Sequence, residues 1–280
     1  FSTSTDEPET TPGEQDTPSS APQPGTKKPQ TGNARCSDKY LLDRGHVDIK
    51  AQSAEGGFAT VLRDDTAQVD KKSVDRKLDD VVLGVHDNAL TPRNKKLAGK
   101  EFDFLGKPGE RFYHLPQTQD QNIIWPGYNT QDLDYSSTKD NAVNLNLKPT
   151  STPDGAEWGA FIDGSHGKGF SVLANSAAKD YTIETNFPAH THTHWAFSKP
   201  GLYTFEATYT ATGTDGKELK SAPQTLTFAV GDDADVQAAQ DTTWNPDDAQ
   251  TTGSSIPTWV FILAGVGAVV LLLALGLVLR

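Results

Sequence analysis

Three histidines at alternate positions, His190, His192 and His194, are the residues of this chain whose type and spacing point most directly to chemistry. In an extended strand, residues two apart project from the same face, so this spacing predicts three imidazoles on one side. Imidazole is a common protein ligand for zinc and similar ions. The alternative is a polar surface strand whose histidines bind nothing. Trp195 and Phe197 follow at odd positions, and we expect them on the opposite, core-facing side.

The strands that must position these histidines are short and numerous. Helical periodicity is scarce, whereas short alternating apolar segments separated by Gly, Pro, Asn and Asp recur along the chain. This pattern predicts an all-β domain over residues 38–230, with the architecture of an Ig-like β-sandwich. The segments expected as strands are 46–49, 58–62, 81–85, 142–147, 158–162, 170–173, 181–184, 203–211 and 224–230.

Two further segments carry structural expectations. Residues 201–211 and 222–230, joined by a Gly-rich turn, predict a terminal hairpin. Tyr203, which enters this hairpin after Pro200-Gly201, is expected to pack inward with its hydroxyl on nearby backbone. Residues 115–131 are rich in aromatic residues, amides, Pro and Gly, and predict a long ordered loop over the edge of the sandwich. A sugar-binding surface is the alternative interpretation of that segment.

The ends of the chain differ in composition from the domain. Residues 1–37 are rich in Thr, Ser, Pro and Gln, which predicts a disordered arm, and residues 231–255 predict a flexible acidic stalk. The start at Phe1 suggests that a signal peptide has been removed. Cys36 is the single cysteine, so an intramolecular disulfide is impossible and we assign it no role.

The C-terminal segment 256–280 predicts a transmembrane anchor. It is apolar up to the final Arg280 and long enough to cross a bilayer as one helix. A positive charge beyond the span favours a cytoplasmic C-terminus. We therefore expect a single-pass protein of the cell membrane with its folded domain outside. The net charge of −12 makes nucleic acid a poor candidate partner.

Several blocks of the sequence also resemble a known family. The blocks are residues 40–49, 115–119, 125–130, 161–165, 190–197 and 200–203. In this order they are similar to the actinobacterial surface-anchored domain called choice-of-anchor M, also described as an ABC-transporter-associated surface-anchored repeat. The similarity spans about Tyr40 to Val230. It implies an exported domain with a variable anchor, and a partner among metal-type ABC importers.

The resemblance also implies a ligand set. The family's His-x-His falls on His190 and His192, and the histidine of its opening block falls on His46. These three imidazoles would form an open site with a free fourth position. Asp48 shares the strand face of His46 and is a weaker candidate, as a fourth ligand or as an acceptor that orients an imidazole. His194 is also a weaker candidate, because the family often has Asn there.

We interpret the remaining histidines, His86, His114 and His166, as surface residues. The leading functional hypothesis is a membrane-anchored surface protein that captures zinc for an ABC importer, with manganese favoured less because it prefers oxygen ligands. Haem binding is an alternative within the same class. A structural or adhesive envelope module without metal is the other alternative. An enzyme is not expected, because no nucleophile elbow, His-Glu-x-x-His or paired carboxylate is present.

Overall fold

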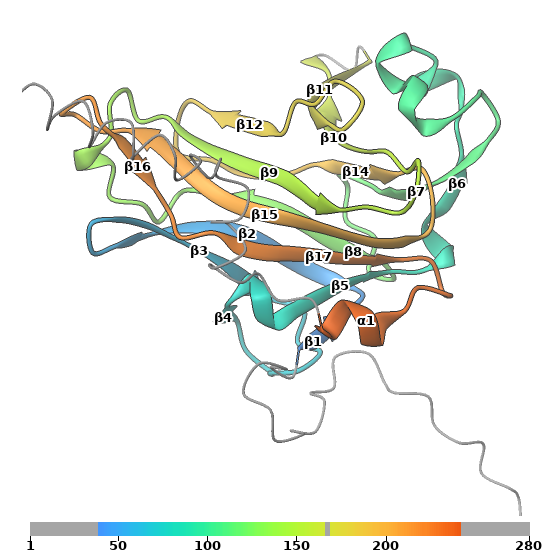
Figure 1. The fold of residues 1–280 in the computed structure, drawn as a ribbon, viewed down its shortest axis with the longest axis horizontal. Coiled ribbons are helices and arrows are strands. Elements are labelled where there is room, and N and C mark those ends of the chain that lie inside the picture. The colour runs from blue at the N-terminus through green and yellow to red at the C-terminus, as the bar shows by residue number, and fades with distance from the viewer. Residues whose placement is uncertain (1–38, 166–168, 242–280) are drawn as a thin grey trace, which may run out of the picture.

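The computed structural model describes residues 39–165 and 169–241 of the chain. Within these residues the protein is all-β: strands form three sheets, and a single short α-helix follows the last strand. The strands expected from the sequence are present, with boundaries shifted by a few residues. Figure 1 shows the longest of them running side by side across the molecule.

The largest sheet has seven strands and includes the predicted terminal hairpin. Its order is β1-β5-β17-β15-β9-β12, with β16 pairing β15. The bounds are β1 Tyr40–Leu42, β5 Val81–Val85, β9 Val143–Ser151, β12 Thr182–Thr185, β15 Gly201–Thr212, β16 Glu218–Lys220 and β17 Gln224–Val230. Strands β15 and β17 pair antiparallel, which confirms the hairpin.

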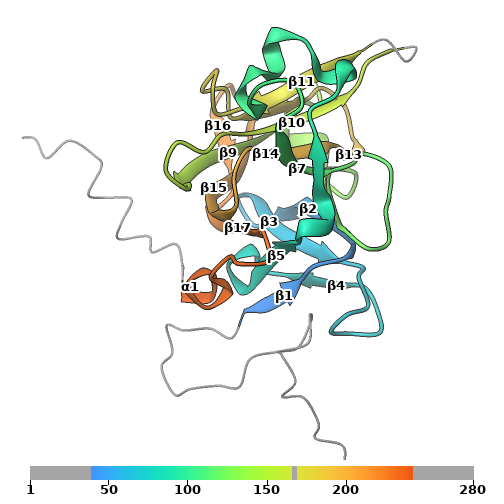
Figure 2. The same ribbon diagram turned by 90° about the vertical axis from the view of Figure 1, so that its right-hand side faces the viewer.

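Two five-stranded sheets complete the fold. One has the order β11-β10-β14-β7-β6, and the other has the order β13-β8-β2-β3-β4. The first consists of β6 Leu90–Pro92, β7 Arg111–Leu115, β10 Trp158–Asp163, β11 Phe170–Asn175 and β14 His194–Phe197. The second consists of β2 Gly45–Ala54, β3 Gly57–Asp64, β4 Val74–Arg76, β8 Ile124–Asn129 and β13 His190–His192. Figure 2 separates the two sheets, with β10 and β7 above β2 and β3.

The helices are short. The 3₁₀ helices are Leu78–Asp80, Asp87–Ala89, Lys95–Leu97, Lys100–Leu105 and Tyr135–Ser137, and α1 is Val236–Asp241. Among residues 39–165 and 169–241, no helix combines the length and hydropathy needed to cross a membrane. The predicted anchor 256–280, the arm 1–37 with Cys36, and His166 lie outside the described residues.

One main core joins the three sheets. Ile49 of β2, Trp195 of β14 and Phe205 of β15 are each at most 1% exposed and belong to the same cluster of buried side chains. Burying such side chains stabilises the fold by roughly 1.5–3 kcal/mol each before entropy is counted. The expected core roles of Trp195, Phe197 and Tyr203 are confirmed, and the Tyr203 hydroxyl donates a 2.7 Å hydrogen bond to the Lys199 carbonyl.

The fold continues past the expected end at residue 230. Ala239 of α1 is fully buried and packs with Val82 and Ala229 in a small cluster of its own. The buried Lys39 ammonium donates to the Ala239 carbonyl, so that the two ends of the described chain lie together (Figure 1). The predicted stalk over 231–255 therefore begins too early, because its first residues cover apolar surface of β5 and β17.

Candidate metal centre

Two strands that are not paired with each other supply the candidate ligands. His46 and Asp48 lie on β2, whereas His190 and His192 lie on the edge strand β13. Strand β8 lies between them, parallel to β2 and antiparallel to β13. In this register Gly127 of β8 pairs with Asp48 on one side and with His192 on the other. Alternation along each strand then places all four side chains on one face of the sheet.

Gly127 makes room for this convergence. A Cβ atom at this position would lie 2.7 Å from Asp48 Oδ1, 2.8 Å from His192 Cε1 and 2.9 Å from the Thr191 carbonyl oxygen. Real Cβ atoms essentially never approach other atoms this closely. The absent side chain therefore leaves the space in which the functional groups from β2 and β13 meet across the middle strand.

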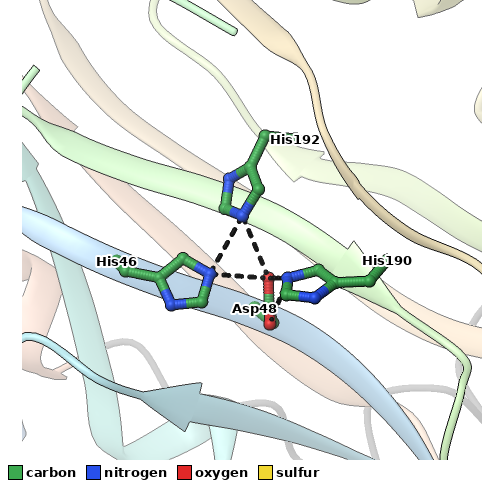
Figure 3. Close-up of side chains that lie close together, drawn as sticks. All are labelled: His46, Asp48, His190 and His192. Carbon is green, nitrogen blue, oxygen red and sulfur yellow. Dashed lines mark hydrogen bonds and ion pairs between the residues drawn. The ribbon is translucent and has the colours of Figure 1, made fainter. Parts of the chain in front are cut away.

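The four functional groups point toward a common centre (Figure 3). His46 Nε2 lies 2.9 Å from His192 Nε2 and 3.4 Å from Asp48 Oδ1. The same carboxylate oxygen lies 3.1 Å from His190 Nε2 and 3.6 Å from His192 Nε2. One potential ligand atom from each of the four residues lies within 4.8 Å of all the others.

Four of the separations are close to those around a tetrahedral ion. Two ligand atoms that are each about 2.0–2.1 Å from a tetrahedral zinc ion lie about 3.3 Å from each other. Four of the six separations, from 2.9 to 3.6 Å, fall on both sides of that value. The other two, from the potential ligand nitrogen of His190 to those of His46 and His192, lie within 4.8 Å. Three imidazoles and one carboxylate are also a ligand set that zinc accepts. The group formed by His46, Asp48, His190 and His192 can therefore hold a metal ion.

A second carboxylate orients one of the imidazoles. Asp65, which follows the end of β3, lies 3.0 Å from His46 Nδ1 through its Oδ2. When His46 is neutral, a proton on Nδ1 donates to this carboxylate and leaves the Nε2 lone pair directed at the centre. Carboxylate partners of this kind fix the ring and raise its basicity toward a metal. Sequence reasoning missed Asp65, because its contact with His46 depends on the register in which β3 pairs with β2, and the local sequence does not predict that register.

Burial and charge act in opposite directions on Asp48. The residue is 1% exposed, and this burial on its own would raise the pKa of its carboxyl. The hydrogen bond from His46 and the charges of the three neighbouring histidines outweigh it, so the pKa of Asp48 stays below its ordinary value. Asp48 is thus held as a carboxylate, the form that binds cations.

The two best-placed histidines titrate differently. The hydrogen bond to Asp48, together with the charges of Asp48 and Asp65, raises the pKa of His46 above 6.5 despite burial. Burial is the main cause that lowers the pKa of His192 to about 4. His192 is therefore neutral over the physiological range and ready to coordinate. His46 keeps its second proton to a higher pH than a free imidazole, so a cation competes with that proton.

The site differs from the expected open three-histidine site. Asp48, the weaker candidate, lies at the centre with the histidines, so the group offers four potential ligand atoms, enough for a tetrahedral set without a free position. The side chain of His190 is 34% exposed, against 10% for His192 and 1% for Asp48. Because His190 also lies on the edge strand of the sheet, solvent reaches the group from that side.

His194 does not join the other two histidines of its motif, so the expectation of three imidazoles on one face is wrong. The chain passes from one sheet into another at Thr193, and His194 begins β14. Its ring lies 5.0 Å from the His114 ring and 4.7 Å from that of Phe161. Trp195 and Phe197 do face the opposite side, into the main core, as expected.

The surface interpretation of His114 is wrong as well. Its Nε2 lies 2.9 Å from His194 Nδ1, and its ring stacks on Phe161 at 6.0 Å. Burial, aided by the charge of His194, lowers the pKa of His114 to about 4. His86 is 43% exposed and accords better with the expectation, although both of its ring nitrogens contact carboxylates, those of Asp43 and Asp232.

The expected long loop over residues 115–131 contains a strand. Residues Ile124–Asn129 form β8, which lies inside its sheet between β2 and β13. Pro126 and Gly127 are residues that normally argue against an interior strand. Trp125 stacks on His192 with ring centroids 3.5 Å apart, so its indole belongs to the wall of the candidate metal centre.

We compared the chain with family models, with curated proteins and with solved structures. None of the three comparisons found a match. The chemistry of the four clustered residues is thus the main evidence on function.

Proposed function

We propose that this protein binds a single transition-metal ion, zinc most readily, between β2 and β13. The observation that carries the proposal is the convergence of three imidazole nitrogens and one buried carboxylate oxygen on one point. A buried carboxylate is costly unless it has a compensating partner, and a divalent cation is such a partner. The same negative charge favours binding of a proton to His46, and the pKa of His46 is raised for this reason.

Zinc is favoured by the donor set. Three of the four ligand atoms are imidazole nitrogens, which suit zinc, whereas manganese prefers more carboxylate or carbonyl oxygen. Haem is not favoured, because it needs an apolar slot and the centre is formed by a buried Asp48 and three imidazoles. We propose binding rather than catalysis, since catalytic zinc sites keep one position open for water or substrate.

We further propose that the binding site is displayed at the cell surface. Support comes from the apolar segment 256–280, the closing Arg280, and the resemblance to the choice-of-anchor M domain. In this account the β-domain is an Ig-like sandwich, consistent with the hydroxyl of Tyr203 bonding backbone. The protein would capture zinc near a metal-type ABC importer.

Thermal unfolding tests zinc binding. A ligand that binds only the folded state raises the unfolding temperature as its concentration rises. We expect zinc to stabilise the chain 1–280 in detergent micelles, with a smaller effect of manganese. His192→Ala should lose the zinc-dependent shift, whereas His86→Ala, which removes a histidine outside the centre, should keep it. A structural or adhesive module without metal predicts no shift in any of the three proteins.

The surface display is tested separately. Deleting residues 256–280 should release the domain from the membrane fraction into the aqueous fraction. At growth-limiting zinc, cells without the protein should accumulate zinc more slowly, and the wild type but not His192→Ala should restore uptake. Continued sedimentation of the truncated chain with membranes would contradict the anchor, and equal rescue by both proteins would contradict the role in uptake.

A further inference from the structure

The third histidine of the motif does not belong to the candidate metal centre. His194 is 8% exposed and lies among the aromatic rings of Phe161, Phe170 and His114. Only Thr193 separates it in sequence from the proposed ligand His192. The hydrogen-bond partners of its two ring nitrogens therefore indicate its role.

One of those nitrogens anchors Gln117. The backbone N–H of Gln117 donates to His194 Nδ1 at 3.1 Å, and the side-chain oxygen of Gln117 accepts from the Asp163 N–H at 2.8 Å. Because a backbone N–H can only donate, His194 Nδ1 must be the acceptor and the ring proton sits on Nε2. That Nε2 lies 3.3 Å from Asp163 Oδ1, where the proton finds its acceptor.

The fixed Gln117 in turn holds the indole of Trp125. The Gln117 carbonyl accepts a 2.9 Å hydrogen bond from Trp125 Nε1. The Trp125 ring lies almost parallel to the His192 ring, with an interplanar angle of 14° and centroids 3.5 Å apart. It also lies 5.3 Å from the His46 ring. The contacts thus run without interruption from His194 to the ring of a proposed metal ligand.

We propose that Trp125 is a positioning residue for His192, and that His194 fixes Trp125 through Gln117. This inference rests on the metal-binding function proposed above. In this arrangement His190 and His192 bind the ion. His194 lies two residues further on, in a different sheet, and fixes the Trp125 indole on which the His192 ring stacks. The indole restricts rotation of the His192 ring while its Nε2 points to the centre.

Such support affects affinity because the ligand is ordered before the ion arrives. Restricting a side chain in its bound conformation removes an entropic cost from binding. Partners that orient metal ligands typically change affinity by about 10- to 100-fold when they are removed. We expect Trp125→Ala to weaken zinc binding by roughly tenfold, and Trp125→Phe, which keeps an aromatic face but lacks the N–H, by about threefold or less.

The matched pair His194→Ala and His114→Phe isolates the route. Both residues are packed in the same aromatic cluster and bond each other, but only His194 accepts the Gln117 N–H. We expect zinc binding, measured by competition with a chromophoric chelator, to weaken by roughly three- to tenfold in His194→Ala. His114→Phe should bind zinc within about twofold of the wild type.

A spectroscopic readout that needs no metal completes the test. In the zinc-free chain 1–280, NMR should find the His192 ring protons shifted upfield by the face of the Trp125 indole. The shift should vanish in Trp125→Ala, persist in part in Trp125→Phe, decrease in His194→Ala and remain in His114→Phe. If the wild type bound no zinc, the proposed function would fail. The chemical shifts would still test whether Trp125 positions the His192 ring, because they are measured without metal.

Two results would overturn the inference. One is wild-type zinc affinity in Trp125→Ala, which would show that the indole does not support the ligand. The other is a set of His192 ring-proton shifts that Trp125→Ala leaves unchanged. An equal loss of affinity in His194→Ala and His114→Phe would contradict the route through Gln117, because only one of the two residues contacts it.

Discussion

The Nε2 atoms of His46 and His192 lie 2.9 Å apart although 146 residues separate them in the chain. Two neutral imidazoles can face each other at this distance only if one donates a proton to the other. A cation between them would accept both lone pairs and remove the need for that proton. The same pair is joined by Asp48, 3.4 and 3.6 Å from the two nitrogens, which supplies the negative charge that a cation requires.

Adding one methyl group at the centre of the sheet should disable the site. In Gly127→Ala the new Cβ would meet Asp48 and His192 below 3.0 Å, so the two ligands must move apart. We expect zinc affinity to fall at least tenfold by isothermal titration calorimetry. Gly216→Ala is the control: its Cβ meets open space, but its φ of +80° makes the substitution strained. It should cost stability and leave affinity unchanged; an equal loss in both variants would mean that general destabilisation explains the effect.

Removing the carboxylate that orients His46 should weaken binding without removing a ligand. We expect Asp65→Asn to lower zinc affinity by roughly 10- to 100-fold, because the His46 ring loses its charged acceptor. Asp75→Asn is the matched control, since Asp75 pairs with Arg63 and Lys50 rather than with a histidine. Chelator competition would measure both affinities. Equal affinities of the two variants would argue against the role assigned to Asp65.

The pH dependence of zinc binding should follow His46 rather than His192. The pKa of His46 is raised above 6.5 by Asp48 and Asp65, so below that pKa the ion must displace a proton from this ring. The pKa of His192 is lowered to about 4, so this ring competes little. Affinity should therefore increase as pH rises through a midpoint above 6.5. Calorimetry in buffers of different ionisation enthalpy would count the released protons, and affinity that stays constant from pH 6 to pH 8 would contradict this order.

The metal-free fold should lose stability in mild acid through His114. Its pKa of about 4 in the folded state lies below the ordinary value of 6.5, because burial disfavours the charged ring. The unfolded chain then binds more protons, so stability is retained above pH 6.5 and lost as pH falls from about 6.5 to about 4. The loss should be on the order of 1–3 kcal/mol. Denaturant unfolding of His114→Phe should show a shallower decline than the wild type, and parallel declines would refute this assignment.

Strand alternation carried most of what the sequence predicted about the site. It placed His190 with His192 and Asp48 with His46, and the resemblance joined the two pairs. Alternation failed at Thr193, because it assumes one continuous strand and the chain changes sheets there. His194 consequently points into an aromatic cluster. The role of Asp65 could not be predicted for another reason, because its contact with His46 depends on the pairing of β2 with β3.

The all-β fold was predictable because short alternating segments leave few other options. The interior strand β8 was not, since Pro126 and Gly127 are locally typical of turns. Its place is set by tertiary pairing, with β2 on one side and β13 on the other. The helix α1 escaped notice because six residues of mixed composition carry little periodicity, and its burial depends on the apolar surface of Val82.

The most direct test of the central claim is elemental analysis combined with zinc-edge X-ray absorption on the chain 1–280, purified without chelator and saturated with zinc. The account predicts one equivalent of zinc, held by three nitrogens and one oxygen at about 2.0–2.1 Å. His192→Ala should lose the stoichiometric zinc while staying folded, because the core depends on Trp195, Phe197 and Tyr203. Replacing His194 should leave the stoichiometry at one. Wild-type protein without stoichiometric zinc, or a His192→Ala variant that binds it equally well, would contradict the proposal that His46, Asp48, His190 and His192 form a metal site.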